Sequence, residues 1–467
     1  MGRNYRRNYQ RDFKREGKKT YYRKSTKGNT IHKRSIFLSL AILCTALGIA
    51  VGSQWLPEQA RTLKYRIHSG KEEKNNSRAS KTPEEEKQEL SDNPLIRVVL
   101  MTNGYQGIIH KEVKLRADSE LTLTYGNRTE QIAAGECVVV TADDARLSEG
   151  NMRIEAKDGV LQIESMKRGD GVPAYNGVIE LRRAENGIVV VNELPIETYL
   201  CRVVPSEMPA SYELEALKAQ AVCARSYAYM ESYGYPEYEA HVNDSTDYQV
   251  YGNSLPDERA DRAVEETKGQ TVWYQGKIVT TYYYSTSCGR TTNAEAWGST
   301  PSEENGYLQS VDVKGTDGDY EKALPWYRWH AKIPEQEMEE NIRRNTGKDI
   351  GELKSVEVTM RGAGDVALVL TAVGSKCTVT VETENKIRTA LAGDYDIVKQ
   401  DGSTRNCGKL LPSAFFTIKK EKGSYCIEGG GFGHGIGMSQ TGANEMAKQG
   451  KNYREILELF YPGVNVE

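Results

Sequence analysis

Short apolar runs, each with partial alternation of apolar and polar residues, fill the stretch from Ile96 to Val191. They are IRVVLM, KLRAD, LTLTYG, CVVVTA, MRIEA, VLQIES, GVIELR and GIVVV, and Gly, Asn and Asp separate them. Runs of this length that are bounded by turn residues are typical of β-strands. The pattern predicts a β-rich lobe over residues 96–190.

The period of the pattern changes after Pro209, where apolar residues recur every three or four positions. This spacing places side chains on one face of an α-helix. The positions are Leu214, Leu217, Ala221, Ala224 and Ala228. We expect Ser211 to cap this helix and Gly234 to end it. Because most of these residues are alanine, other elements can pack close to the helix, which makes it the short, Ala-rich helical core of the fold.

The remainder of the chain mixes both patterns. Helices are predicted over residues 257–267 and 335–346, and two short helices follow from about Ser439 onward. Strand-like runs between them include GQTVWYQ, KIVTTYYYSTS, VEVTM, DVALVLT, CTVTVE and YCIEGG. The predicted fold class is therefore mixed α+β with a β-rich body.

One uncharged apolar segment near the start of the chain predicts a single transmembrane helix. Residues 35–57 (SIFLSLAILCTALGIAVGSQWLP) are long enough to span a bilayer as a helix, since about 20 helical residues cross its hydrocarbon core. Residues 1–34 hold 13 Lys and Arg, so the positive-inside rule places this tail in the cytoplasm and the body on the outer side. The alternative is a secretory signal peptide that is cleaved near Ala50.

The charged, apolar-poor residues 58–93 predict a flexible linker, and residues 94–467 then form the body. Seven cysteines lie beyond the apolar segment. None of them stands in a CxxC motif or in a Cys/His cluster with the spacing of a metal site. Cys377 and Cys407 could form a disulfide, although nothing in the sequence specifies that pairing.

Glu207 lies between two prolines in VVPSEMP, after a strand-like run and before the predicted helix. Pro205 and Pro209 restrict the backbone around this acid. A stiff backbone suits a general acid, whose proton must be aimed at one oxygen, and apolar neighbours could raise its pKa. The alternative is an ordinary acid in the first turn of a helix, where the helix dipole favours negative charge.

Three further clusters carry candidate chemistry. Gln220 and Arg225 lie off the apolar face of the helix, where Arg225 binds either an acidic ligand or, more commonly, a structural ion-pair partner. YYYSTSCGR (282–290) is either a sugar-binding surface of rings and hydroxyls or a partly buried strand. GHGIGMSQ (433–440) surrounds His434 with glycines, which allow a ligand to approach the backbone. A Ser-His catalytic pair lacks its usual sequence context here.

Five motifs together resemble the stage II sporulation protein D family and the related amidase-enhancer domain of bacterial cell walls. In chain order they are NELPIETYLCRVVPSEMP, EALKAQAVCARSYAY, YYYSTSCGRTTNAEAW, GYLQSVDV and GHGIGMSQTGANEMA. They occur in the family's order and cover roughly residues 94–467. The basic tail, the single anchor and the linker also match the layout of that family.

The resemblance implies a membrane-anchored lytic transglycosylase that cleaves peptidoglycan glycan strands lacking stem peptides during engulfment of the forespore. It implies that Glu207 is the catalytic residue, acting first as acid and then as base, and that the product carries a 1,6-anhydro sugar. It also implies a set of substrate-binding residues, namely Gln220, Arg225, Gln249, Tyr284, Ser287, His434, Ser439 and Gln440.

The partners that the resemblance implies are the amidase stage II sporulation protein P and the membrane scaffold stage II sporulation protein M. We expect neither nucleic acid nor a cofactor. Some clostridial relatives carry a Cys/His zinc site before a Gln-x-Tyr motif. This chain keeps Gln249 and Tyr251 of that motif but has no cysteine there, so we expect no metal. Cys201, Cys288 and Thr441 also depart from the family's usual residues.

Two other functions remain open. A muramidase would hydrolyse the same bond, and it would need a second carboxylate, for which Asp244 and Asp247 are the candidates. A wall-binding activator would stimulate an amidase without cleaving glycan, and Glu207 would then be dispensable.

Overall fold

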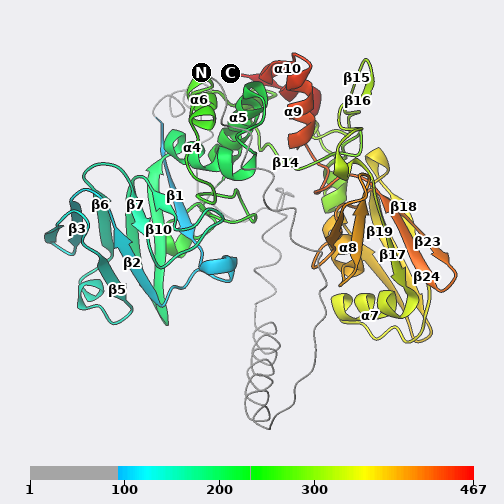
Figure 1. The fold of residues 1–467 in the computed structure, drawn as a ribbon, viewed down its shortest axis with the longest axis horizontal. Coiled ribbons are helices and arrows are strands. Elements are labelled where there is room, and N and C mark those ends of the chain that lie inside the picture. The colour runs from blue at the N-terminus through cyan, green and yellow to red at the C-terminus, as the bar shows by residue number, and fades with distance from the viewer. Residues whose placement is uncertain (1–92, 232) are drawn as a thin grey trace, which may run out of the picture. The chain divides into compact units, whose positions relative to one another are not determined.

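The computed structural model describes residues 93–231 and 233–467, all of which belong to one compact unit. The predicted tail (1–34), transmembrane segment (35–57) and nearly all of the linker (58–93) lie outside the described residues. No helix among the described residues is long and apolar enough to span a bilayer. These residues form seven α-helices and many short strands (Figure 1), which confirms the predicted mixed α+β, β-rich class.

Two sheets occupy most of residues 95–195. The larger sheet has the order β11-β1-β10-β9-β6-β3-β4, in which β1 and β11 pair in parallel and all other neighbours are antiparallel. Its strands are β1 (Leu95–Leu100), β3 (Leu121–Tyr125), β4 (Arg128–Ile132), β6 (Met152–Ala156), β9 (Val178–Ala184), β10 (Gly187–Pro195) and β11 (Val242–Asn243). The smaller sheet contains β2 (Glu112–Arg116), β5 (Val138–Thr141), β7 (Leu161–Ile163) and β8 (Ala174–Tyr175). Side chains of β3 alternate between buried and partly exposed, as expected for strands with one face on a core.

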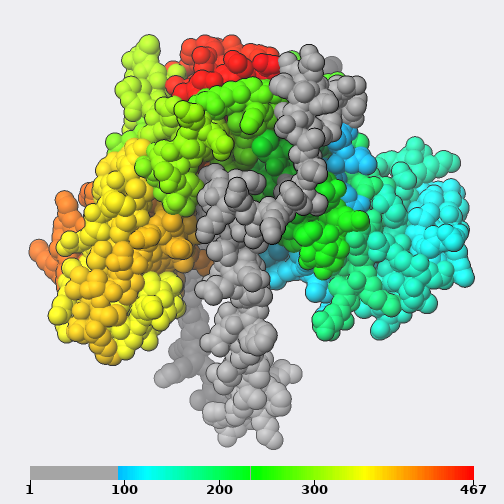
Figure 2. All heavy atoms as spheres, turned by 180° about the vertical axis from the view of Figure 1, so that it is seen from behind, coloured from blue at the N-terminus to red at the C-terminus, as the bar shows by residue number. Residues whose placement is uncertain are grey.

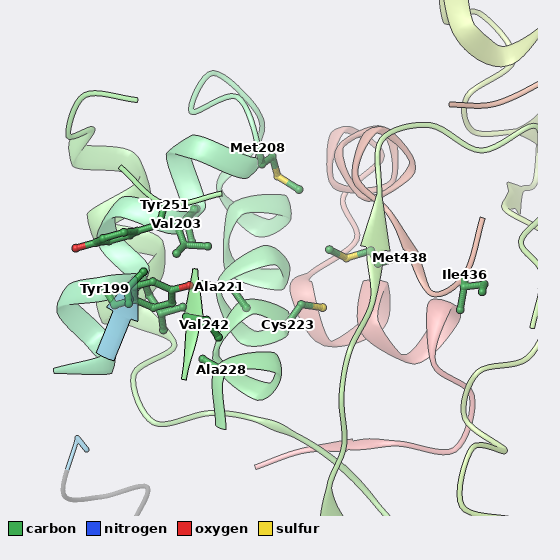
Figure 3. Close-up of a cluster of buried hydrophobic side chains, with 14 of the residues drawn as sticks. Tyr199, Val203, Met208, Ala221, Cys223, Ala228, Val242, Tyr251, Ile436 and Met438 are labelled. Atoms are coloured by element: carbon green, nitrogen blue, oxygen red, sulfur yellow. The ribbon is translucent and has the colours of Figure 1, made fainter. Parts of the chain in front are cut away.

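Three helices follow these sheets in the chain, namely α4 (Ile196–Glu207), α5 (Leu214–Met230) and α6 (Glu258–Glu266). The alanine face predicted for α5 is buried, and Ala221 and Ala224 have no exposed surface. Figure 3 shows Tyr199, Val203 and Tyr251 on one side of α5 and Met438 on the other, so this helix packs against elements on both sides.

The predicted ends of α5 were wrong. The helix begins after Glu213 rather than at Ser211, and it ends at Met230, before Gly234. Ser211 is exposed and lies in a turn, where it has no helix to cap.

Residues 272–467 contain five smaller sheets and four helices. The helices are α7 (Glu335–Thr346), α8 (Glu384–Leu391), α9 (Gln440–Lys448) and α10 (Tyr453–Phe460). One sheet, of order β22-β21-β17-β24-β23, contains β17 (Trp329–Pro334), β21 (Asp396–Lys399), β22 (Thr404–Asn406), β23 (Phe416–Glu421) and β24 (Ser424–Gly429). Another contains β18 (Leu353–Arg361), β19 (Ala367–Gly374) and β20 (Thr378–Glu382). A small three-stranded sheet contains β12 (Val272–Tyr274), β13 (Lys277–Ile278) and β26 (Asn465–Val466). Two further sheets have two strands each. One pairs β14 (Tyr283–Tyr284) with β25 (Met438–Ser439), and the other pairs β15 (Lys314–Gly315) with β16 (Gly318–Asp319).

The parallel pairing of β14 with β25 joins two of the motifs that the sequence singled out. Tyr283 lies opposite Met438, and Tyr284 lies opposite Ser439. Helix α9 follows β25 directly, and Figures 1 and 2 show the C-terminal helices (red) beside the green segment that contains α5. The YYYSTS and GHGIGMSQ segments are therefore held against the Ala-rich helix, although about 150 residues separate them in the chain.

Candidate active site

Glu207 is the last residue of helix α4, so the strand-like interpretation of the preceding residues was wrong. The segment combines valines with Pro205, all poor helix formers, but burial of its apolar face outweighs that preference. The chain leaves the helix at Met208, whose backbone is extended (φ −130°, ψ 133°). The carboxyl group of Glu207 therefore stands at the negative end of a helix dipole, not in the first turn of the next helix.

Two donors hold the carboxyl group of Glu207. The backbone N–H of Val250 donates to its Oε1 at 2.5 Å, and the hydroxyl of Tyr283 donates to the same carboxyl group. The Glu207 residue as a whole is partly accessible, whereas its carboxyl group is buried. The protein therefore holds the acid in a defined orientation.

Burial raises the pKa of Glu207 to about 7, from an ordinary value of 4.5. The Val250 N–H and the Tyr283 hydroxyl both lower this pKa, because they stabilise the charged form, but they do not offset the desolvation. Both the protonated and the ionised forms are therefore populated near neutral pH. That property is required of one group that must act as an acid and then as a base.

Buried amides support Glu207 and Tyr283. The Gln440 Nε2 donates to the backbone carbonyl of Glu207 at 3.0 Å and to Gln220 Oε1 at 3.3 Å. The Gln249 Nε2 donates to the hydroxyl of Tyr283 at 3.1 Å. The amide nitrogen of Gln220 has no hydrogen-bond partner among the described residues. The structure thus brings three predicted site residues, Gln220, Gln249 and Gln440, around Glu207.

His434 packs near Tyr284, with ring centroids 5.4 Å apart. Its Nε2 donates to the backbone carbonyl of Tyr283 at 2.9 Å, and its Nδ1 accepts the N–H of Ile436 at 3.1 Å. Burial lowers the pKa of His434 to about 4, so the ring is neutral at physiological pH. Because backbone groups occupy both nitrogens, only the ring faces and edges of His434 can contact a ligand, and no Ser-His pair is formed.

Ser287 and Ser439 meet at a buried carboxylate, Glu321, that the sequence did not reveal. The hydroxyls of Ser287, Ser439 and Thr441 all donate to Glu321, as does the backbone N–H of Ser287 at 2.9 Å. Ser287, Ser439 and Glu321 have almost no exposed surface. The two serines therefore brace the loop and the start of α9 instead of lining an open surface. Glu321 lies in the polar stretch TDGDYEKALP, where nothing distinguishes it from a solvated acid.

Arg225 has no exposed surface and lies at a structural ion pair. Its Nε and Nη2 donate to the two carboxylate oxygens of Glu197, each at 2.7 Å. Its remaining donors reach the backbone carbonyls of Gln270 and Val264 and the hydroxyl of Thr267. The structure does not bring Arg225 to the group around Glu207, and it supports the structural partner that the sequence left as one alternative.

The two candidate second carboxylates differ in their surroundings. Asp244 is fully buried, accepts hydrogen bonds from Arg168 Nε at 3.0 Å and from the Met101 N–H at 2.9 Å, and has no accessible oxygen for water activation. Asp247 is exposed and lines a cavity of about 370 Å³ together with Val250, the residue that donates to Glu207. Of the two, only Asp247 could meet a ligand.

Within residues 93–231 and 233–467, no group of three or more His, Cys, Asp or Glu side chains is arranged to hold a metal ion. The seven cysteines in this part of the chain are unpaired, Cys377 and Cys407 among them.

Besides Glu321, sequence reasoning missed Tyr283, whose hydroxyl donates to Glu207. It lies in the YYYSTS run, from which the motif comparison selected its neighbour Tyr284. Alternation along a strand shows that neighbouring side chains point to opposite faces, but it does not show which face meets Glu207.

Comparison with known proteins identifies two matching family models and several relatives. Residues 184–274 match the family model of a stage II sporulation protein, and residues 295–437 match a domain family of unknown function. Stage II sporulation protein D of Bacillus amyloliquefaciens is 31% identical over 59% of this chain and 75% of its own length. The protein of the same name from Bacillus subtilis (strain 168) is 29% identical over 66% of this chain and 88% of its own length.

A third relative has another name. The amidase enhancer of Bacillus subtilis (strain 168) is 31% identical over 56% of this chain, but the match spans only 39% of the enhancer's length. The family model and these relatives give the chain a sporulation role that is related to the cell wall. More specifically, the chain belongs to the stage II sporulation protein D family, which confirms the resemblance seen in its motifs.

Proposed function

We propose that this protein is a lytic transglycosylase that cleaves peptidoglycan glycan strands lacking stem peptides and leaves 1,6-anhydro-muramic acid ends. The observation that carries the proposal is the single carboxyl group of Glu207, which is held by Val250 and Tyr283 and has a pKa of about 7. Family membership supports a role in wall remodelling during sporulation.

The reaction uses one carboxyl group twice. Protonated Glu207 gives its proton to the glycosidic oxygen as the bond from that oxygen to C1 of muramic acid breaks. The resulting carboxylate then takes the proton of the C6 hydroxyl, whose oxygen forms a bond to C1. No water is consumed, and Glu207 ends in its protonated form, so the cycle closes. A pKa of about 7 suits both halves of this cycle.

The two hydrogen-bond donors on Glu207 help its carboxylate to act as the base in the second step. The N–H of Val250 and the hydroxyl of Tyr283 stabilise the ionised form after the first proton transfer. They also fix the direction of the free oxygen, so the group meets two substrate oxygens in turn with little movement.

We propose a setting that follows from the chain's first 93 residues and from the family. Residues 35–57 would anchor the protein in the cell membrane, with residues 1–34 in the cytoplasm and the body on the cell-wall side, in the septal and engulfing membrane of the mother cell. Its partners would be the amidase stage II sporulation protein P and the scaffold stage II sporulation protein M.

A second function is supported by the relative named amidase enhancer. In that case the body binds the wall and stimulates an amidase, and the carboxyl group of Glu207 does no chemistry. A hydrolytic muramidase is the third alternative, with exposed Asp247 as its second carboxylate.

The products of the reaction distinguish these functions. The full-length chain, in mild detergent, is incubated with purified glycan strands lacking stem peptides, and the fragments are read by mass spectrometry. We expect anhydro-ended fragments from the native chain and none from Glu207→Gln. The matched control is Glu213→Gln, which changes an exposed acid six residues away and should cleave normally.

Other outcomes would change the conclusion. Fragments with reducing ends would indicate hydrolysis and direct attention to Asp247. An absence of cleavage, together with equal stimulation of an amidase by the native chain and by Glu207→Gln, would establish the activator instead.

A further inference from the structure

Gln249 is buried between three elements, and both polar atoms of its side chain are bonded to the protein. Its exposed fraction is 1%. The hydroxyl of Tyr199, on α4, donates to its Oε1 at 3.3 Å. Its Nε2 donates to the backbone carbonyl of Ala224, on α5, at 3.3 Å and to the hydroxyl of Tyr283, on β14, at 3.1 Å. An amide nitrogen carries two hydrogens, so these two acceptors use both of them.

The carbonyl of Ala224 determines which end of the Gln249 amide is the nitrogen. A hydroxyl can donate or accept, so Tyr199 and Tyr283 alone would fit either orientation of the amide. A backbone carbonyl can only accept. A reversed amide would place its oxygen against the Ala224 oxygen, and no proton would lie between the two acceptors. The nitrogen of Gln249 therefore faces both Ala224 and Tyr283.

This orientation of the amide fixes the direction of the Tyr283 proton. The phenol oxygen accepts an N–H from Gln249, and the phenol has one proton of its own to donate. The amide nitrogen cannot accept that proton, and the hydroxyl of Tyr283 donates to the carboxyl group of Glu207. Tyr199, Gln249, Tyr283 and Glu207 thus form one chain of hydrogen bonds in which every donor points toward the acid. Hydrogen bonds in such a chain polarise and strengthen one another.

Two consecutive residues therefore act on both donors of Glu207. The N–H of Val250 donates to Glu207 Oε1 at 2.5 Å through the backbone. The side chain of Gln249, the residue before it, orients the second donor, Tyr283.

We propose that Gln249 is a positioning residue for the reaction at Glu207, which acts by directing the proton of Tyr283 to the Glu207 carboxyl group. The family resemblance implied instead that Gln249 binds substrate. Its burial and its complete set of protein partners favour the positioning role. The inference rests on the proposed function, because that function supplies the reaction, but the effect of Gln249 on Glu207 can be measured without substrate.

The titratable groups that interact with the charge of Glu207 are tyrosines. Burial raises the pKa of Tyr105, Tyr199 and Tyr283, and the charge of Glu207 adds to each rise, so all three stay neutral near pH 7. Among the described residues, no charged side chain contributes to the pKa shift of Glu207, which burial raises and only the donors Val250 and Tyr283 oppose. Loss of the Tyr283 donation should therefore raise the pKa of Glu207 directly.

The test is a double-mutant cycle between Gln249 and Tyr283. The native chain, Gln249→Met, Tyr283→Phe and the double variant are prepared at full length in mild detergent, and kcat and KM are measured from pH 5 to 9. Methionine is close to glutamine in size but cannot donate, and Gln249→Leu is a second variant of the same kind. The matched control is Gln400→Met, at an exposed glutamine whose Nε2 donates to the backbone carbonyl of Lys322 at 2.8 Å.

A second measurement follows Glu207 without substrate. Thermal unfolding of each chain is recorded from pH 5 to 9, with and without Glu207→Gln. The pH dependence that Glu207→Gln removes belongs to the Glu207 carboxyl group, so it reports the pKa of this group even in a chain that cleaves nothing. The failure of the inference is thereby distinguished from the failure of the proposed function.

We expect Gln249→Met to raise the midpoint of the kcat/KM profile by roughly half a unit to one unit, as Tyr283→Phe does, because both changes remove the same donation. KM should stay near the native value. The double variant should have the midpoint of Tyr283→Phe, and Gln400→Met should keep the native profile. In the unfolding experiment, the loss of stability with rising pH that belongs to Glu207 should extend to higher pH in Gln249→Met, since its folded pKa is raised further above the unfolded value.

Three outcomes would contradict this expectation in different ways. A raised KM with an unchanged midpoint would overturn the positioning role and support the substrate contact that the resemblance implied. A further shift on adding Gln249→Met to Tyr283→Phe would also overturn it, because Gln249 would then act on Glu207 by a route other than Tyr283. An absence of cleavage by the native chain would overturn the proposed function, and the unfolding data would still decide whether Gln249 directs the Tyr283 proton to Glu207.

Discussion

The pKa of Glu207 is raised by burial, and the hydrogen bonds that it accepts oppose the shift. This differs from a pair of carboxylates that share a proton, where repulsion between like charges raises one pKa. The pKa of Glu207 therefore depends on the packing around this one side chain. Removal of a neighbouring hydrogen-bond donor should raise this pKa further.

The first prediction concerns the pH dependence of cleavage. Because Glu207 must be protonated to act as the acid, kcat/KM should fall as the pH rises through about 7. Tyr283→Phe removes a donor that stabilises the carboxylate, so the fall should move to higher pH by roughly half a unit to one unit. The measurement is kcat/KM from pH 5 to 9, with Tyr282→Phe as the control that keeps the native profile. An unchanged midpoint in Tyr283→Phe would contradict the assignment.

The second prediction concerns stability. Folded Glu207 has a pKa of about 7, above its ordinary value of 4.5, so the folded chain holds a proton that the unfolded chain releases between these values. Its contribution to stability is therefore largest below pH 4.5 and is lost as the pH rises to 7. Glu207→Gln avoids this loss and should be more stable than the native chain at pH 8, by about 1–3 kcal/mol.

Thermal unfolding at pH 5 and pH 8 checks this prediction, because the difference between the two chains should grow with pH. The exposed Glu213→Gln variant should show no such growth. A constant difference between native chain and Glu207→Gln would mean that the carboxyl group ionises normally in the folded state.

At the scale of elements, Arg225 of α5 ties that helix to Glu197 in the first turn of α4. Removing one partner of a buried ion pair leaves an uncompensated charge, so Arg225→Met should lower the free energy of unfolding by about 3 kcal/mol. The KM of the folded Arg225→Met protein should stay near the native value. Arg262→Met, at an exposed arginine, is the control and should change neither the stability nor the KM. A raised KM at native stability would instead support the substrate-binding role implied by the resemblance.

Glu321 plays a similar part between the YYYSTS segment and α9. Glu321→Ala would leave three hydroxyls without their acceptor, and we expect a loss of about 3 kcal/mol. Glu321 holds Ser439, and the next residue, Gln440, donates to the backbone carbonyl of Glu207, so kcat should fall as well.

Thr441→Val removes one of the three hydrogen bonds to Glu321 and should lower the free energy of unfolding by about 1–2 kcal/mol. Chemical unfolding and cleavage assays check both, and a native kcat in Glu321→Ala would contradict the positioning role.

These elements show where prediction from the sequence succeeded and where it could not. Alternation and helical spacing predicted the strands of residues 96–190 and the face of α5, because one buried face imposes a local period. Helix α4 was missed because its valines and Pro205 have low helix propensity, and only tertiary burial stabilises it. No local pattern could show that Glu321 is buried, since its three hydroxyl partners come from distant segments.

At the scale of the whole molecule, the residues around Glu207 come from widely separated parts of the chain. Val250 lies 43 residues away and Gln440 lies 233 residues away. The matched family model ends at residue 274, before Tyr283 and Gln440. The site therefore depends on folding of the complete described body, and the matched segment alone lacks part of it.

The last prediction concerns the membrane anchor that we propose for residues 35–57. If residues 35–57 anchor the protein, the full-length chain should sediment with membranes and resist extraction with high salt or carbonate, since an uncharged segment of this length spans a bilayer. Deletion of residues 35–57 should release the body. The tail of residues 1–34 should be protected from added protease in intact protoplasts, while the body is digested, because its 13 Lys and Arg favour the cytoplasmic side. A released body whose N-terminal sequence begins shortly after Ala50 would instead establish a cleaved signal peptide, and the wall would then be reached by diffusion rather than from a fixed anchor.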